Sequence, residues 1–270
     1  MPDKKERSCC GIMVSVIFPA AGRGKRMQAG MNKVFMELSG IPILVRTLLR
    51  FSDCSQVDNL VVVVGEGEVQ FVKGILKRIP SLKPWQVVAG GSERQYSVWN
   101  GIQSIENPSD DDIILVHDAA RPLISTEVIQ ETIKTAREKG GAIAAVPAKN
   151  TIKICNEKQE VVETPDRSTL WEVQTPQGFR RDILVRANEL AVKDGFLGTD
   201  DASLVERCGY PVYIVNSDYR NIKITTPEDI VVAKAFLHET AKENPQEESL
   251  ENTLKAFVEE IKVKFLREDD

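Results

Sequence analysis

Short apolar runs alternate along the chain with longer stretches whose apolar positions recur at helical spacing. The apolar runs predict strands at residues 14–20, 59–65, 85–90, 112–116 and 142–148. The stretches between them predict helices at residues 43–51, 69–79, 92–105 and 125–139, with Ser92 and Ser125 or Thr126 as N-caps. The run at 59–65 is apolar on both faces, as parallel sheets require. This alternation predicts an α/β fold with a doubly wound, mostly parallel sheet.

Two segments depart from this alternation. Residues 148–175 predict two short strands around a polar turn at 156–160, which is a hairpin. The hairpin is either an exposed excursion or an arm that crosses to a second subunit. Beyond a capped helix at 226–237 and a polar linker, residues 250–265 place apolar side chains on one helical stripe. We therefore divide the chain into a body, residues 1–237 with the arm at about 148–170, and a charged C-terminal extension, residues 238–270.

Composition narrows the classes of partner. The chain is 42% hydrophobic and 28% charged, which is typical of a soluble globular protein. It has no apolar run of membrane-spanning length and no signal-peptide pattern, so we expect no membrane partner. Its five cysteines lack CxxC spacing, which indicates reduced thiols and a cytoplasmic protein. Residues 239–270 carry ten acids and five bases, which accounts for the whole net charge of −5. The nearly neutral body argues against a nucleic-acid-binding face.

The loop after the first predicted strand is glycine-rich and cationic. Arg23, Lys25, Arg26 and Lys33 occur in it without any acid between Arg23 and Lys33. Glycines let backbone N–H groups converge on an anion, and paired cations would neutralise a polyphosphate. The spacing matches neither a P-loop nor, because Met27 replaces the third glycine, a dinucleotide fingerprint.

Two further strand ends carry candidate chemistry. Asp118 ends a buried strand, where a carboxylate is a typical Mg²⁺ ligand or a helix N-cap. His117 and His238 are the only histidines, so a zinc site or a Ser-His-Asp triad is disfavoured and His117 is interpreted as structural. The segment "AGGSERQYSV" follows a strand with paired glycines, which would let a flat base approach the backbone near Ser97.

The motifs together are more specific than any one of them. "PAAGRGKRM" with Lys33 downstream, "GGSERQYSV", "VHDAARP", "DR" before "WEVQTPQ", "GTDDAS" and "NIKITTPED" occur in this order. From about residue 14 to 237 the chain resembles the 2-C-methyl-D-erythritol 4-phosphate cytidylyltransferases. The resemblance implies a Rossmann-like nucleotidyltransferase fold with a protruding hairpin arm. It also implies transfer of CMP from CTP to methylerythritol phosphate, with release of pyrophosphate, in the non-mevalonate isoprenoid pathway.

The resemblance assigns roles residue by residue. It implies that Arg26 and Lys33 stabilise the transition state, that Asp118 holds Mg²⁺, and that Lys223 fixes both phosphoryl groups. It implies a nucleotide site formed by Ala20, Ala21, Gly22, Gly91, Arg94 and Ser97. Substrate contacts would come from Thr151, Arg167, Thr175 and Thr199, with Thr151 and Arg167 supplied by the second chain of a homodimer. Asn32 stands where proline commonly precedes the catalytic lysine, which predicts a freer backbone there.

Other functions remain open from sequence. A ribitol 5-phosphate cytidylyltransferase shares the nucleotide half of the site, although "HDAARP" and "WEVQTPQ" favour methylerythritol phosphate. A non-catalytic nucleotide-binding module is disfavoured because Arg26 and Lys33 are both present. An NAD-dependent oxidoreductase is disfavoured by Met27.

Overall fold

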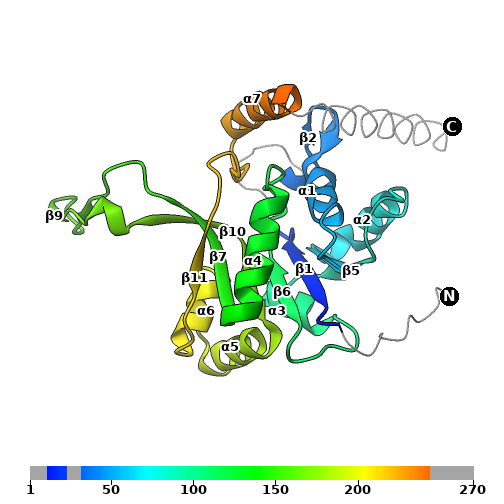
Figure 1. Cartoon of the computed structure of the whole chain (residues 1–270), viewed down its shortest axis with the longest axis horizontal. Helices are drawn as coiled ribbons and strands as arrows, with labels where there is room; N and C mark the ends of the chain where they lie inside the picture. The colour runs from blue at the N-terminus through cyan, green and yellow to red at the C-terminus, as the bar shows by residue number, and fades with distance from the viewer. Residues whose placement is uncertain (1–10, 23–31, 244–270) are drawn as a thin grey trace.

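A seven-stranded mixed sheet forms the centre of the protein (Figure 1). The computed structural model describes residues 11–22 and 32–243. The strand order is β11-β7-β10-β6-β1-β4-β5. All neighbouring strands are parallel except β10, which runs antiparallel to both β6 and β7. The strands are β1 (Val14–Pro19), β4 (Asn59–Val64), β5 (Trp85–Ala89), β6 (Ile113–Val116), β7 (Gly141–Pro147), β10 (Trp171–Arg180) and β11 (Tyr213–Asn216).

Helices cover both faces of the sheet because successive strand residues point to opposite sides. In β1, Val16 and Phe18 join one core and Ile17 joins the other. The first core packs against α1 (Ile43–Ser52), α2 (Val69–Leu76), α4 (Thr126–Lys139) and α7 (Pro227–Glu243). The second packs against α3 (Arg94–Gln103), α5 (Arg181–Asp194) and α6 (Asp201–Arg207). The predicted doubly wound, mostly parallel sheet is confirmed.

Helix ends follow the sequence signals in one case and depart from them in another. The Ser125 hydroxyl accepts the Val128 N–H at the start of α4, and Gly140, at φ 90°, ends that helix in the left-handed region. The predicted Ser92 cap is wrong, because α3 begins at Arg94 and its N-cap residue is Glu93. At the other end of the chain, α7 continues past Leu237 to Glu243. The apolar stripe at 250–265 lies outside the described residues, so the role of the extension stays a prediction.

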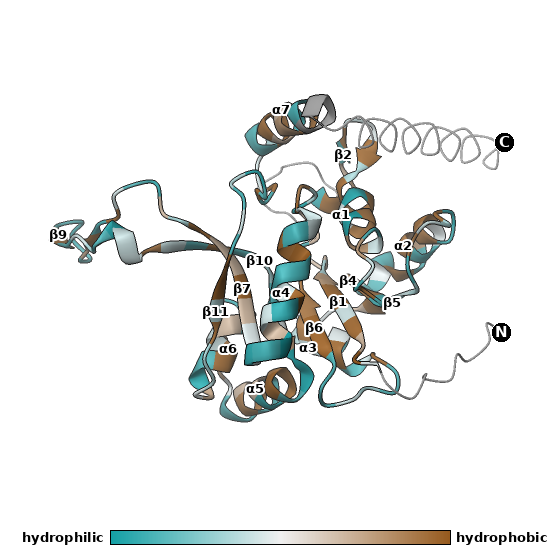
Figure 2. Cartoon of the chain, in the orientation of Figure 1, coloured by the Kyte–Doolittle hydropathy of each residue, from teal (hydrophilic) through white to brown (hydrophobic). Residues whose placement is uncertain are grey.

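The predicted hairpin is confirmed as an arm that projects from the body (Figures 1 and 2). It continues from β7 and returns through β10, with β8 (Ile154–Cys155) and β9 (Val161–Glu163) paired near its tip. At the turn, the Asn156 N–H donates to the Glu160 carbonyl, as the polar turn at 156–160 predicts. No helix in the described parts of the chain is long and apolar enough to cross a membrane.

Helix α3 lies against the sheet through a glycine. A Cβ on Gly101 would lie 2.8 Å from a methyl of Ile17 and 3.1 Å from a methyl of Val63, both in the strands beneath. We expect Gly101→Ala to lower the free energy of unfolding by about 1–3 kcal/mol through overpacking. Gly74→Ala is the matched control, since Gly74 is also in a helix but has open space around it. It should raise the unfolding free energy by roughly 0.5–1 kcal/mol. Urea denaturation measures both, and an equal stabilisation of the two variants would contradict this packing argument.

Candidate active site

A cavity of about 340 Å³ opens at the carboxyl ends of β1 and β6. The chain leaves β1 for β4 on one side, and β6 lies on the other, so this is the point where ligands bind in doubly wound sheets. Its walls include nine of the predicted site residues: Ala20, Ala21, Gly22, Lys33, Gly91, Arg94, Ser97, Asp118 and Lys223. The structure therefore brings together residues from the first strand, the α3 segment, the end of β6 and the segment before α7.

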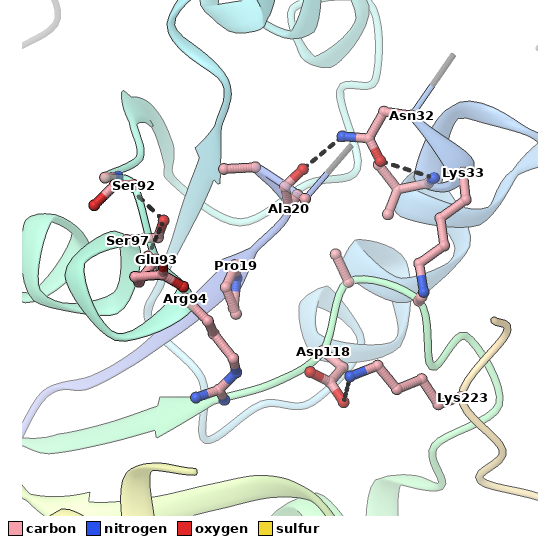
Figure 3. A pocket seen from close by; sticks show the side chains of 16 residues that line it. Pro19, Ala20, Asn32, Lys33, Ser92, Glu93, Arg94, Ser97, Asp118 and Lys223 are labelled. Carbon is pink, nitrogen blue, oxygen red and sulfur yellow. Dashed lines mark hydrogen bonds and ion pairs between the residues drawn. The ribbon is translucent and has the colours of Figure 1, made fainter. Parts of the chain in front are cut away.

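The carboxylate of Asp118 is the acidic centre of this cavity (Figure 3). Its Oδ2 lies 3.0 Å from the Lys223 Nζ and 3.1 Å from the Arg121 Nε. Burial alone would raise the pKa of Asp118. The positive charge of Lys223, followed by that of Arg121 and Arg94, outweighs burial and holds this pKa well below its usual range. Asp118 is therefore ionised at neutral pH, and both recorded ion pairs use the same oxygen.

Two buried side chains fix the backbone that carries Asp118. The Thr175 hydroxyl accepts the Asp118 N–H at 3.0 Å and lies 3.0 Å from the Nδ1 of His117. The Nε2 of His117 lies 3.1 Å from the carbonyl of Arg121, so it donates that bond and Nδ1 accepts from Thr175. Burial lowers the pKa of His117 to about 3, so the ring is neutral. The sequence interpretation of His117 as structural fits this position.

Lys33 crosses from the first strand's side of the cavity to the segment before α7. Its Nζ donates to the carbonyl of Ile224 at 2.8 Å, next to Lys223. Figure 3 shows Lys33 extending toward the side of the cavity formed by Asp118 and Lys223. Two lysines that are far apart in the chain thus line one cavity, as a polyphosphate site requires.

The backbone before Lys33 is not free, which corrects the expectation at Asn32. The Asn32 side chain is buried and its Nδ2 donates to the Ala20 carbonyl at 2.6 Å. Its Oδ1 accepts from the Val34 N–H at 3.4 Å and so caps the short helical turn Lys33–Phe35. Asn32 has a φ of −63°, the value that proline would impose. The side chain therefore ties the start of this turn by hydrogen bonds to Ala20, directly after β1.

The opposite wall is formed by the segment that begins α3. A Cβ on Gly91 would come within 2.5 Å of the Tyr96 Cβ, so the wall has no room for a side chain there. The Ser97 hydroxyl accepts the Gly91 N–H and donates to the Glu93 carbonyl. Arg94 forms an ion pair of 2.6 Å with Asp201, a buried carboxylate at the start of α6. The two helices are thus joined beside the cavity.

Four of the predicted substrate contacts lie outside this cavity. Thr151 and Arg167 are exposed on the arm, and Arg167 donates to the carbonyl of Lys149. Thr175 is buried behind Asp118. Thr199 is exposed and lines a second, smaller hollow of about 80 Å³ that shares Glu93 and Arg94 with the first. Arg26 lies outside the described residues.

Two residues that sequence reasoning passed over support the site. Arg121 donates from Nε to Asp118 and from Nη1 to the Asn221 carbonyl at 2.7 Å. The buried Asn221 side chain donates to Gln174 and to the carbonyl of Thr175, both on β10. Both residues belong to motifs already noted, "HDAARP" and "NIKITTPED". Their hydrogen bonds form only in the folded chain, so no local pattern could reveal them.

The fold and the site define an α/β nucleotidyltransferase, with cations around one carboxylate at the strand ends. A family model, that of the 2-C-methyl-D-erythritol 4-phosphate cytidylyltransferases, matches residues 14–239, and the chain belongs to this family.

Named relatives agree with this assignment. The cytidylyltransferase of Bacillus pumilus is 49% identical, over 82% of this chain and 96% of its own length. That of Caldanaerobacter subterraneus is 44% identical, over 83% of this chain and 98% of its own length. Among solved structures, the 4-diphosphocytidyl-2C-methyl-D-erythritol synthase of Anaerococcus prevotii has a TM-score of 0.75 and 30% identity. It covers 84% of this chain and 96% of that one.

The neutral state of His117 predicts how stability depends on pH. In the unfolded chain its pKa returns to about 6.5, whereas in the folded chain it is about 3. Between these values the unfolded state binds the extra proton, so stability falls as pH falls below 6.5. The loss is up to about 1.4 kcal/mol per pH unit.

Urea denaturation between pH 7 and 5 measures this slope. The variant His117→Gln, which keeps a donor toward the Arg121 carbonyl, should flatten it. His238→Gln, at an exposed position on α7, is the matched control and should keep the wild-type slope. Equal slopes in the wild type and in His117→Gln would contradict the assignment of a neutral buried ring.

Proposed function

We propose that the protein transfers CMP from CTP to 2-C-methyl-D-erythritol 4-phosphate in the non-mevalonate isoprenoid pathway. An oxygen of the sugar phosphate attacks the α-phosphorus of CTP, and the bond from that phosphorus to the bridging oxygen breaks. Pyrophosphate leaves and 4-diphosphocytidyl-2-C-methyl-D-erythritol forms. The observation that carries this proposal is the cavity that Lys33, Lys223 and Arg94 line together with the ionised Asp118, in a chain of this family.

The roles proposed for the residues follow from charge. Negative charge shifts from the α-phosphoryl group to the pyrophosphate as the bond breaks, so nearby cations stabilise the transition state. Lys33 and Lys223 border the same side of the cavity, which supports these roles for them. For Arg26 the same role rests on its motif. Gly91 and Ser97 both line the cavity and are joined by a hydrogen bond, and their proposed role in binding cytosine also rests on their motif.

We also propose Mg²⁺ as the cofactor, with Asp118 as its protein ligand. Within the described ranges no group of three or more histidine, cysteine or acidic side chains is arranged to hold a metal. A single carboxylate nonetheless fits Mg²⁺, which in phosphoryl-transfer sites takes its other ligands from phosphates and water. Asp118 is ionised, and its recorded ion pairs leave Oδ1 for such a ligand. When bound, Mg²⁺ would neutralise charge on the phosphates.

A homodimer joined through the arms is the proposed assembly. The arm and the adjoining start of β10 expose apolar side chains that a monomer would leave in water, between 37% and 60% accessible: Ile152, Ile154, Val161, Val162, Trp171 and Val173. Because Thr151 and Arg167 lie on the arm and away from their own cavity, we propose that they complete the site of the partner subunit.

The free thiols of Cys54, Cys155 and Cys208 support a cytoplasmic location.

Pyrophosphate release tests the proposed reaction. With CTP and Mg²⁺, we expect release with 2-C-methyl-D-erythritol 4-phosphate and little with ribitol 5-phosphate. Lys33→Ala should lower kcat by about 10²-fold or more if Lys33 acts on transition-state charge. Lys134→Ala, on an exposed helix face, is the matched control and should turn over normally. Pyrophosphate release with ribitol 5-phosphate alone would contradict the proposed substrate and identify the protein as a ribitol 5-phosphate cytidylyltransferase.

Subunit mixing tests the shared site. Arg26→Ala and Arg167→Ala chains should each be nearly inactive alone. If the arm completes the partner's cavity, a mixed dimer contains one cavity in which both arginines are intact. We expect activity to return on mixing, to about a quarter of the wild-type level for random pairing of equal amounts. Activity that stays at the level of the separate variants would show that each site is built within one chain.

A further inference from the structure

Gln95, the second residue of α3, joins the nucleotide wall to the loop that carries Thr199. Its side-chain amide is almost fully buried and both ends are used. Nε2 donates to the Phe196 carbonyl at 3.0 Å, and Oε1 accepts the Gly198 N–H at 2.9 Å. A single side chain thus fixes the backbone on both sides of Leu197, directly before Thr199.

This loop has little freedom on its other side. A Cβ on Gly198 would lie 2.5 Å from the Ser203 hydroxyl oxygen and 2.7 Å from a methyl of Leu204, both on α6. The amide of Gln177 completes the attachment: it donates to Asp200 and accepts the N–H groups of Asp201 and Ala202. The loop is therefore held between α3, α6 and β10.

The position of the loop matters because it forms the second hollow. Leu197, Gly198 and Thr199 line that hollow together with Arg94 and Gln95 of α3. Arg94 also lines the nucleotide cavity, and Ser97 lies one turn further along the same helix. A shift of the loop relative to α3 would change the second hollow while leaving the nucleotide wall in place.

We propose that Gln95 is a positioning residue for the second substrate. By fixing Phe196–Gly198 to α3, Gln95 determines where Thr199 contacts the polyol phosphate. It thereby aligns this acceptor substrate with bound CTP. This inference rests on the proposed function, because it takes Thr199 as a contact of the polyol phosphate.

The test uses Gln95→Met, which keeps the length of the side chain and removes both hydrogen bonds. We expect KM for 2-C-methyl-D-erythritol 4-phosphate to rise roughly tenfold, the equivalent of about one net hydrogen bond. KM for CTP and the Kd of CTP with Mg²⁺ by calorimetry should stay within about twofold. Gly198→Ala moves the same loop from the α6 side. It should likewise raise KM for 2-C-methyl-D-erythritol 4-phosphate and leave KM for CTP nearly unchanged. Gln86→Met is the matched control. Gln86, on β5, loses two amide hydrogen bonds to Ser104 at the C-terminal end of α3, the end away from both hollows, so the kinetics should not change.

A structural readout separates this inference from the proposed reaction. Hydrogen exchange should show loss of protection at the Gly198 amide in Gln95→Met, whether or not the enzyme turns over this substrate. Unchanged protection would overturn the proposed attachment. Lost protection with equal changes in the two KM values, or with none, would overturn its role in positioning the acceptor. A wild-type enzyme inactive with the methylerythritol substrate would overturn the proposed function instead, and the exchange result would still decide the attachment.

Discussion

The buried carboxylate of Asp118 is the group on which the arrangement of the site depends. A charge at this depth is tolerated only because cations and hydrogen-bond donors approach it from several elements. Lys223 and Arg121 pair with its side chain, and Thr175 binds its backbone. These partners come from β10, the turn after β6 and the segment before α7. Satisfying one acid therefore brings three distant parts of the chain to the end of the sheet.

The antiparallel strand β10 connects this group to the arm. The antiparallel β10 lies between β6 and β7, and this places Gln174 and Thr175 beside the end of β6. The strand also forms one side of the arm. Through Asn221, which binds Gln174, Thr175 and Arg121, the root of the arm is connected to Asp118. The root of the arm and the Asp118 carboxylate are in this way joined by a continuous set of hydrogen bonds and an ion pair.

Much of the fold could be predicted from sequence, because β1, β4, β6 and β7 are short apolar runs in which nearly every side chain is buried. The strand β10 could not be predicted, because Pro176 and Gly178 interrupt its apolar pattern. Its polar residues Gln174 and Gln177 are buried and form hydrogen bonds inside the protein. At the site, motif order identified the residues that line the cavity. It did not reveal that Asn32 replaces backbone rigidity with side-chain hydrogen bonds, or that Gln95 binds a distant loop. Such roles depend on geometry that local sequence does not carry.

The close approach at Gly101 has a consequence for the width of the nucleotide pocket. Because Gly101 has no side chain, the backbone of α3 packs directly against the side chains of Ile17 and Val63. The distance between α3 and the sheet also sets the position of the first turn of α3, which forms one wall of the pocket. The end of β1 forms the other wall. The width of the pocket therefore depends on the thickness of the hydrophobic layer between α3 and the sheet. A bulkier residue in the core would widen the pocket without altering any residue that lines it.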